Sequence, residues 1–247
     1  FIRELNNMGL NDARYETKRT IYNQNAIVLL SVSIVLIALA GGNLFPQTGV
    51  GEGLRNRKEF VRLEESKEVK ILLKYASSDN FMKENLYGEF TFCYLHREAF
   101  SKFQKAITKL KERKPNWKFI LYDCLRPRSI QYKLWKKVKG TLQEPYVANP
   151  YKGSIHNFGF ALDLSVLDEF GKEIDMGTAF DDFTPLAEPT KEEKFFKEGK
   201  LTKIQIENRK ILRSIMIQSG FIQRPNEWWH YDALPQSIVQ KKFRIVE

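Results

Sequence analysis

Two short stretches, far apart in the chain, contain residue types that could together hold a metal ion. The first runs from Ser154 to Asp163 and includes His156, and the second is Glu227-Trp228-Trp229-His230. Two imidazoles and one carboxylate supply the three protein ligands of a catalytic zinc site that keeps its fourth position open for water. We therefore expect His156, Asp163 and His230 to bind one zinc ion. Glu227 would lie beside the ion without binding it and would be free to act as a base.

Each of these residues has a simpler interpretation when it is considered alone. A single histidine such as His156 is more often structural, and a single aspartate such as Asp163 can cap a turn. The joint pattern favours a metal site, because H-x6-D is followed by E-x-x-H in a chain that has only three histidines. The third histidine, His96, has no partner motif nearby and is expected to be structural.

A metal-dependent hydrolase also needs a donor for the negative charge that develops on the scissile carbonyl oxygen. The apolar segment 117–124 predicts a strand, which is followed by Leu125-Arg126-Pro127. Pro127 cannot donate to the hydrogen-bond ladder of a sheet, so the strand is expected to end here. This places Arg126 at a strand end, and we interpret it as the residue that stabilises the transition state.

The hydrophobic patterns predict an α+β fold, in which a small central antiparallel sheet is flanked by helices and carries the zinc site. Strands are expected at 69–75, 90–95, 117–124, 160–166 and within 221–231, and helices at 98–113, 129–138 and 192–219. Gly159 allows the backbone to turn so that His156 and Asp163 converge. On a regular strand Glu227 and His230 would face opposite sides, so a bulge or strong twist is expected between them.

The composition predicts one catalytic domain. The chain has 247 residues, of which 43% are hydrophobic, and a formal net charge of +10. An excess of basic residues favours adhesion to polyanions, but the lysines fall on the solvated faces of amphipathic segments, so nucleic-acid binding is not expected. Cys93 and Cys124 fall on two separate predicted strands, and the sequence leaves open whether they form a disulfide or are two buried thiols.

The N-terminal region predicts export. Residues 26–40 form an uncharged apolar run that follows several basic residues and ends in Ala38-Leu39-Ala40, as in a signal peptide. Without cleavage, the run 26–45 approaches the roughly 20 residues that span a membrane. We expect residues 1–40 to be a signal peptide or membrane anchor, 41–58 a linker and 59–247 the catalytic zinc domain. The expected location is the periplasm or cell envelope, and the oligomeric state stays open.

Four motifs together resemble the zinc D-alanyl-D-alanine dipeptidases, within a wider group that includes D,D-carboxypeptidases, peptidoglycan endopeptidases and the hedgehog signalling domain. The similarity covers roughly residues 69–231. The motifs are Ser154-x-His156-x6-Asp163, Glu227-Trp228-Trp229-His230, Tyr122-Asp123-Cys124-Leu125-Arg126-Pro127 and Met176-Gly177-Thr178-x-Phe180-Asp181. The H-x6-D motif alone marks only the wider group, and its combination with the other three is specific for the dipeptidase branch.

The resemblance implies a role for each matching residue. His156, Asp163 and His230 would bind one Zn²⁺ per chain, Glu227 would be the general base that activates the zinc-bound water, and Arg126 would stabilise the transition state. Asp181, with Tyr75 and Ser154, would bind the free termini of the substrate, and Asp181 would take the ammonium. The implied reaction is hydrolysis of the small dipeptide D-Ala-D-Ala to two D-alanines in cell-wall metabolism.

Two other functions stay open from the sequence. One is a peptidoglycan D,D-carboxypeptidase or endopeptidase with the same zinc site, although the loops 141–154 and 172–200 are long enough to close a small pocket around a dipeptide. The other is a zinc-stabilised binding module without catalysis, which would need neither Glu227 nor Arg126. The best-known dipeptidases of the family are cytosolic and act in glycopeptide resistance, so the export signal favours a role in wall turnover or nutrient recovery.

Overall fold

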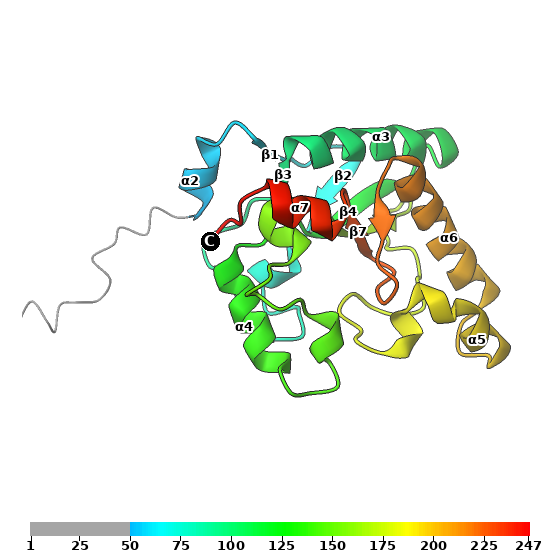
Figure 1. Cartoon of the computed structure of the whole chain (residues 1–247). Helices are drawn as coiled ribbons and strands as arrows, with labels where there is room; N and C mark the ends of the chain where they lie inside the picture. Colours follow the sequence, from blue (N-terminus) through cyan, green and yellow to red (C-terminus); the bar gives the residue numbers. More distant parts are fainter. Residues whose placement is uncertain (1–49) are drawn as a thin grey trace, which may run out of the picture. The chain divides into compact units, whose positions relative to one another are not determined.

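The computed structural model describes residues 50–247 (Figure 1). The expected signal peptide or anchor at 1–40, and the apolar run 26–45, lie outside the described residues. Among the helices of the described part, none has the length and apolar character needed to cross a membrane. Helix α2 (Val50–Arg55) lies within the range expected as a linker, and its Leu54 is buried in the core.

The fold is α+β, as predicted, and is organised around a five-stranded sheet with the order β2-β4-β5-β7-β6. These strands are β2 (Val69–Ile71), β4 (Lys118–Asp123), β5 (Ala161–Leu167), β6 (Ile222–Gln223) and β7 (His230–Asp232). A separate antiparallel pair joins β1 (Phe60–Arg62) to β3 (Tyr94–His96). The central strand β5 is buried along its whole length, so the sheet forms the interior of the domain.

The sheet is mixed rather than purely antiparallel, which corrects the predicted topology. β2 and β4 are parallel, whereas β4, β5, β7 and β6 pair in antiparallel fashion. The chain passes from β2 through β3 and α3 (Arg97–Arg113) before it enters β4. A crossover that includes a helix returns the chain in its original direction, so the two strands that it connects are parallel.

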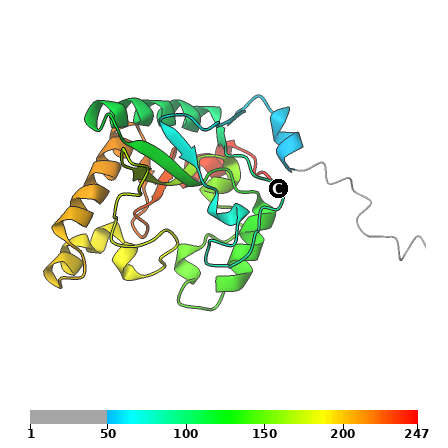
Figure 2. The same ribbon diagram turned by 180° about the vertical axis from the view of Figure 1, so that it is seen from behind.

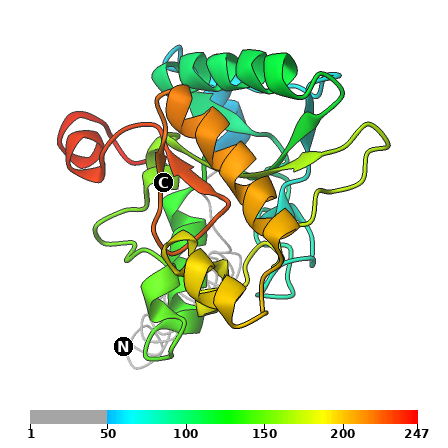
Figure 3. The same ribbon diagram turned by 90° about the vertical axis from the view of Figure 1, so that its right-hand side faces the viewer.

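The helices cover the sheet and form the two ends of the domain. Helix α3 lies at one end, and α4 (Arg128–Val138) and α5 (Glu192–Lys197) lie at the opposite end (Figures 1 and 2). Helix α6 (Lys203–Gln218) runs obliquely from α3 toward α5 (Figure 3). The remaining elements are short: α7 (Gln236–Lys242) and the 3-10 helices η1 (Lys74–Ala76), η2 (Glu144–Tyr146), η3 (Ile155–Phe158), η4 (Pro185–Ala187) and η5 (Pro189–Lys191).

The helix predicted over 192–219 is wrong as a single element, because the structure divides it into α5 and α6. Gly199 between them has φ +68°, a left-handed conformation that ends helices. Thr202 then begins α6 with a capping box, in which its side chain accepts from the backbone N–H of Gln205 and the Gln205 side chain accepts from that of Thr202. Within α6, Ile204 is exposed and Arg209 is buried in the core.

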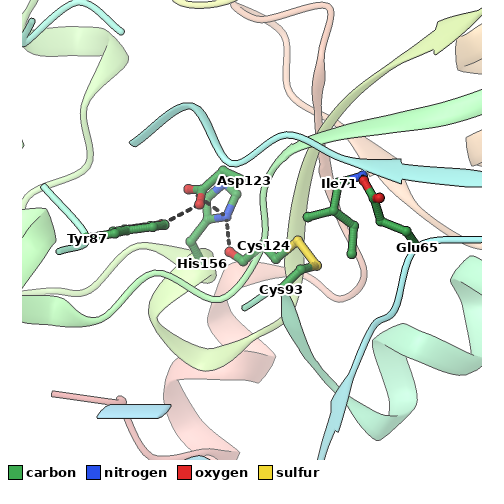
Figure 4. The surroundings of a disulfide bond; sticks show 7 residues. All are labelled: Glu65, Ile71, Tyr87, Cys93, Asp123, Cys124 and His156. Atoms are coloured by element: carbon green, nitrogen blue, oxygen red, sulfur yellow. Dashed lines mark hydrogen bonds and ion pairs between the residues drawn. A yellow bond between two sulfur atoms is a disulfide. The ribbon is translucent and has the colours of Figure 1, made fainter. Parts of the chain in front are cut away.

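Cys93 and Cys124 form a disulfide, which resolves the alternative that the sequence left open. The bond joins the segment before β3 to the residue that follows β4, two residues before Arg126. Figure 4 shows it beside Asp123 and His156. The disulfide therefore restrains the backbone from which part of the candidate site is built.

We expect removal of this disulfide to destabilise the domain strongly. The two cysteines are 31 residues apart, and the chain-entropy estimate for a loop of that length is about 3–4 kcal/mol in the free energy of unfolding. Chemical denaturation of the Cys93→Ala/Cys124→Ala variant, compared with the oxidised wild type, measures this loss. Reduced wild type is the control and should resemble the variant. Equal stability of all three forms would contradict the expectation.

Candidate metal centre and active site

The sheet brings three of the polar side chains of the site into one row. Asp163 on β5 is the register partner of Asp123 on β4 and of His230 on β7. Residues directly opposite each other on neighbouring strands point to the same face of a sheet. Asp123, Asp163 and His230 therefore converge across three adjacent strands, although they are far apart in the sequence.

A β-bulge in β4 makes this row possible. Leu121 pairs with Leu164, but the next pair is Asp123 with Asp163, so Tyr122 is an extra residue on its strand. Without the extra residue Tyr122 would stand opposite Asp163, and Asp123 would point to the other face of the sheet. Tyr122 instead packs with Ile120, Leu167 and Phe180 in a small apolar cluster. The bulge thus turns a buried carboxylate toward the candidate metal site.

His156 reaches the same point from the short helix η3, which precedes β5. Ser154 caps this helix: its side chain accepts from the backbone N–H of His156, and the Asn157 side chain accepts from that of Ser154. Gly159 ends the helix with φ +73°, and a Cβ there would lie 2.9 Å from the backbone nitrogen of His96. This confirms the prediction that Gly159 turns the chain between His156 and Asp163.

The side chains of His156, Asp163 and His230 converge with the spacing of a metal site. His156 Nε2 lies 3.2 Å from both His230 Nδ1 and Asp163 Oδ2. His230 Nδ1 lies 2.9 Å from Asp163 Oδ1. All three residues are buried, and their ligand atoms lie within 4.8 Å of one another. Three such atoms fit around one ion and leave one side of it open for a further ligand.

The second nitrogen of each imidazole is occupied by a hydrogen bond that orients the ring. His156 Nδ1 lies 2.6 Å from the carbonyl oxygen of Cys124, which can only accept, so this nitrogen is the donor (Figure 4). His230 Nε2 lies 2.9 Å from Asp232 Oδ1 and donates in the same way. His156 Nε2 and His230 Nδ1 therefore face the shared point, each with its lone pair or with a proton that a metal ion would displace.

The charges around this point favour a cation. Burial alone would lower the pKa of His230, but Asp232 and Asp163 on either side raise it to about 10. Burial alone would raise the pKa of Asp163, but His156 and His230 hold it well below its ordinary value. The ionised carboxylate and its imidazole neighbours thus provide a donor set that suits a divalent metal.

Glu227 lies next to the metal-ligand group but is not one of its three converging members. Its Oε2 is 3.7 Å from His230 Nδ1, and the residue is 8% exposed. Burial raises the pKa of Glu227 to about 7, against the lowering effect of His230. A carboxylate with this pKa exchanges protons readily at neutral pH.

In place of the expected bulge or strong twist between Glu227 and His230, the structure has a turn at Trp228 and Trp229. The turn ends where β7 begins, and the backbone N–H of Leu164 donates to Trp229 O at 3.1 Å to continue the ladder with β5. Trp228 and Trp229 are both buried. The backbone therefore changes direction between Glu227 and His230 at this turn, before β7 begins, and not within the strand.

Arg126 is held in the site by four side chains, one each from β4, α4, β5 and η3. Its Nε and Nη2 lie 2.7 and 2.6 Å from Asp123 Oδ2, and Nη1 donates to Gln131 Oε1 at 2.8 Å. Nη2 also lies 3.5 Å from Asp163 Oδ2, and Asn157 donates to the backbone oxygen of Arg126. A buried guanidinium held in this way is a fixed positive charge next to the metal-ligand group.

All eight residues that the sequence singled out line one pocket of about 310 Å³. They are Tyr75, Arg126, Ser154, His156, Asp163, Asp181, Glu227 and His230. Tyr75 lies in η1 and not on the predicted strand 69–75, because β2 ends at Ile71. Its hydroxyl donates to Asp181 Oδ1 at 3.0 Å. The volume is near the lower end of the roughly 300–1,000 Å³ typical of small-ligand pockets.

Asp181 presents an unsatisfied carboxylate oxygen. Its Oδ2 is buried and has no hydrogen-bond partner among the residues that the structure describes. Burial raises the pKa of Asp181 well above its ordinary value. A buried carboxylate oxygen without a partner is costly, so this atom is a candidate for contact with a positively charged ligand.

Comparison with known proteins identifies the family. Residues 56–247 match the sequence profile of peptidase M15, described as D-Ala-D-Ala dipeptidase. The chain belongs to this family of dipeptidases. A D-alanyl-D-alanine dipeptidase of Escherichia coli (strain K12) is 31% identical over 170 residues, which are 69% of this chain and 81% of the relative. A D-alanyl-D-alanine dipeptidase of Synechocystis sp. is 24% identical over 56% of this chain and 68% of the relative.

Membership of the M15 dipeptidase family makes the protein a metallopeptidase, and His156, Asp163 and His230 are its possible metal-binding group. Other residues of this M15 site were missed from the sequence. The sequence did indicate a role for Asp123, because a carboxylate within an apolar strand needs a partner and Arg126 is three residues away. It also indicated a role for Asp232, because residues i and i+2 of a strand share a face and Asp232 follows His230 by two. Gln131 gave no signal, since its contact with Arg126 depends on how α4 packs.

We expect Asp232 to control the metal affinity of this M15 peptidase through its hydrogen bond to His230. An Asp232→Ala variant should bind metal about 10- to 100-fold more weakly, which is the usual effect of losing a residue that orients a metal ligand. Asp232→Asn keeps an acceptor for His230 Nε2 and should lose less affinity. Titration against a chelator of known affinity measures both values. Unchanged affinity in Asp232→Ala would show that the ring is oriented by other contacts.

Proposed function

We propose that this chain is a zinc-dependent D-alanyl-D-alanine dipeptidase that hydrolyses D-Ala-D-Ala to two D-alanines. One observation carries the proposal: a possible metal-binding group, a fixed arginine, a buried glutamate and an aspartate with an oxygen that has no partner within residues 50–247 line the same small pocket. These are the groups that a free dipeptide needs, because it has an ammonium, a scissile carbonyl and a carboxylate close together. The two D-alanyl-D-alanine dipeptidases to which the chain is similar support the choice of substrate.

Zinc is the proposed metal because two imidazoles and one carboxylate match the ligands of catalytic zinc sites. His156 would use Nε2, His230 would use Nδ1 and Asp163 would use its carboxylate. When bound, zinc lowers the pKa of water to about 7 and polarises a carbonyl group. The hydrogen bonds from His156 to Cys124 O and from His230 to Asp232 hold both rings ready for this task.

Glu227 is the proposed general base. It is buried at the edge of the metal-ligand group, and its pKa of about 7 allows it to take a proton at neutral pH and give it up again. In this role Glu227 removes a proton from the attacking water and delivers it to the amine nitrogen of the departing D-alanine. The rate gain from this transfer depends on Glu227 remaining unliganded.

Arg126 is the proposed stabiliser of the transition state. Asp123 and Gln131 fix the guanidinium before the substrate arrives, so no reorganisation is needed as charge develops on the carbonyl oxygen. The pKa of Arg126 supports a permanent charge: burial alone would lower it, but Asp123 raises it well above the ordinary value. Arg126 thus remains a cation throughout the reaction.

Asp181, Tyr75 and Ser154 are the proposed contacts for the substrate termini. Asp181 Oδ2, which has no partner among the residues that the structure describes, would pair with the ammonium, while Tyr75 donates to the other oxygen. Ser154 lines the pocket, and its hydroxyl, which accepts from the backbone N–H of His156, is proposed to donate to the substrate carboxylate. Pairing both ends suits a free dipeptide, because a charge left unpaired in a small pocket costs several kcal/mol.

The proposed setting is the cell envelope, where D-Ala-D-Ala released from the wall would be hydrolysed for turnover or recovery of alanine. The apolar segment 26–40 is the basis for this part of the proposal. The Cys93–Cys124 disulfide is consistent with it, since disulfides persist in oxidising compartments.

The decisive experiment gives the purified zinc-loaded protein two substrates in parallel: free D-Ala-D-Ala and a muropeptide that ends in D-Ala-D-Ala. We expect release of alanine from the dipeptide, loss of this activity with a chelator and recovery with added zinc. Release of alanine from the muropeptide alone would overturn the proposal and favour the D,D-carboxypeptidase alternative. Heat-denatured protein with the same zinc content is the control.

A further inference from the structure

Asp181 lies on a segment, 176–187, that needs external support. Asp181 has φ +61°, a left-handed conformation that is unfavourable for a residue with a side chain. It also keeps one carboxylate oxygen buried without a partner in the described part of the chain. The segment has little regular structure apart from η4 at its end. Contacts from other elements must therefore offset the cost of this arrangement.

Arg209 on α6 holds both ends of the segment. Its Nε donates to the backbone oxygen of Met176 at 2.6 Å, and its Nη1 donates to that of Leu186 at 3.1 Å. The side chain is only 1% exposed, and Glu192 lies 3.7 Å from Nη1. Because one rigid guanidinium contacts both ends, the span between them is fixed by the geometry of a single side chain.

Trp228 ties the segment directly to the catalytic region. Its indole Nε1 donates to Thr178 Oγ1 at 2.8 Å, three residues before Asp181. Trp228 is 1% exposed and follows Glu227 in the chain. Gly177 lets the segment pack closely against Leu201, since a Cβ at position 177 would lie 2.5 Å from Leu201 Cδ2. The hydrogen bond between Trp228 and Thr178 thus connects the segment of Asp181 with the turn that follows Glu227.

We propose that Thr178, Trp228 and Arg209 are positioning residues that set the distance between Asp181 and the metal centre. They would thereby limit the length of the substrate: only a peptide whose ammonium and scissile carbonyl belong to the same residue reaches both points. This inference rests on the proposed function, because it takes Asp181 as the partner of the substrate ammonium. It adds the residues that define the length of substrate that the pocket accepts.

The test uses Thr178→Val, which removes the acceptor of the Trp228 hydrogen bond at almost constant volume. The KM for D-Ala-D-Ala should rise about tenfold, as expected from one lost hydrogen bond, while kcat stays within about threefold and metal content is unchanged. A contact made equally in the ground state and the transition state affects KM in this way. Thr178→Ser keeps the acceptor and should restore the wild-type KM.

Two comparisons separate positioning of Asp181 from a general structural effect. Thr184→Val removes a hydroxyl that accepts a hydrogen bond from the backbone N–H of Leu186 within the same segment, and should leave KM unchanged. In an Asp181→Asn background, Thr178→Val should change KM less than twofold further, because residues that act through one contact are not additive. Arg209→Met should also raise KM, and circular dichroism shows whether that variant folds.

The inference is overturned if Thr178→Val leaves KM within twofold of the wild type, or if it raises KM equally with and without Asp181. It is also overturned if kcat and metal content fall together with no separate change in KM. Absence of dipeptide hydrolysis by the wild type is a different result and rejects the proposed function itself. The wild-type measurement therefore comes first, and the variants are compared with it.

Discussion

Replacement of Glu227 by alanine is expected to lower kcat by several orders of magnitude, roughly 10²- to 10⁴-fold from the loss of proton transfer alone. The metal should remain bound at one ion per chain, because His156, Asp163 and His230 converge without help from Glu227. Steady-state kinetics together with metal analysis of the same preparation measures both quantities. Glu227→Gln has nearly the same shape and should be equally inactive, which separates the loss of the base from the loss of packing.

Loss of the metal in Glu227→Ala would contradict this assignment. It would mean that Glu227, whose Oε2 is 3.7 Å from His230 Nδ1, is a metal ligand and that another group is the base. Retention of both metal and near-normal kcat would also contradict it. The alternative base would then be sought among the other carboxylates that line the pocket, Asp163 and Asp181.

The second large effect is expected from Arg126→Lys, which should lower kcat about 10²- to 10³-fold with little change in KM. This is the range seen when one preorganised donor to the transition state is lost. Lysine keeps the positive charge, but it cannot reproduce the fork that contacts Asp123 and Gln131 together. Lysine is preferred to an uncharged residue, because removal of the cation would leave Asp123 buried and unpaired.

The control for this variant is Arg128→Lys, two residues along the chain. Arg128 is partly exposed and pairs with Glu247 at the surface, outside the pocket. The Arg128→Lys variant should have wild-type kinetics and thermal stability. If Arg126→Lys changes KM more than kcat, Arg126 binds the substrate in its ground state, and the role in the transition state is wrong.

The convergence of the candidate site residues in one pocket was more predictable from the sequence than the fold around them. A metal site restricts residue types so strongly that two histidines and an aspartate, with a glutamate three residues before the second histidine, stand out in a chain with only three histidines. Gly159 was predictable for a similar reason, since a left-handed turn before a strand demands glycine. These signals are local, and each can be recognised without knowing which strands pair.

The features that were missed depend on pairing and packing. The bulge at Tyr122 depends on the register between β4 and β5. A shift of this register by one residue changes which side chain of β4 faces Asp163. The parallel pairing of β2 with β4 follows from the path of the chain and not from the composition of either strand. The contacts of Gln131 and Arg209 depend on where two helices pack, which their apolar faces indicate only in part.

Zinc anomalous diffraction from crystals grown with the metal would show whether His156, Asp163 and His230 bind one ion. We expect one anomalous peak per chain, bonded to His156 Nε2, His230 Nδ1 and the Asp163 carboxylate, with Glu227 close by but unbonded. A peak located elsewhere, or an ordered site in which these three side chains bind no metal at saturating zinc, would contradict it.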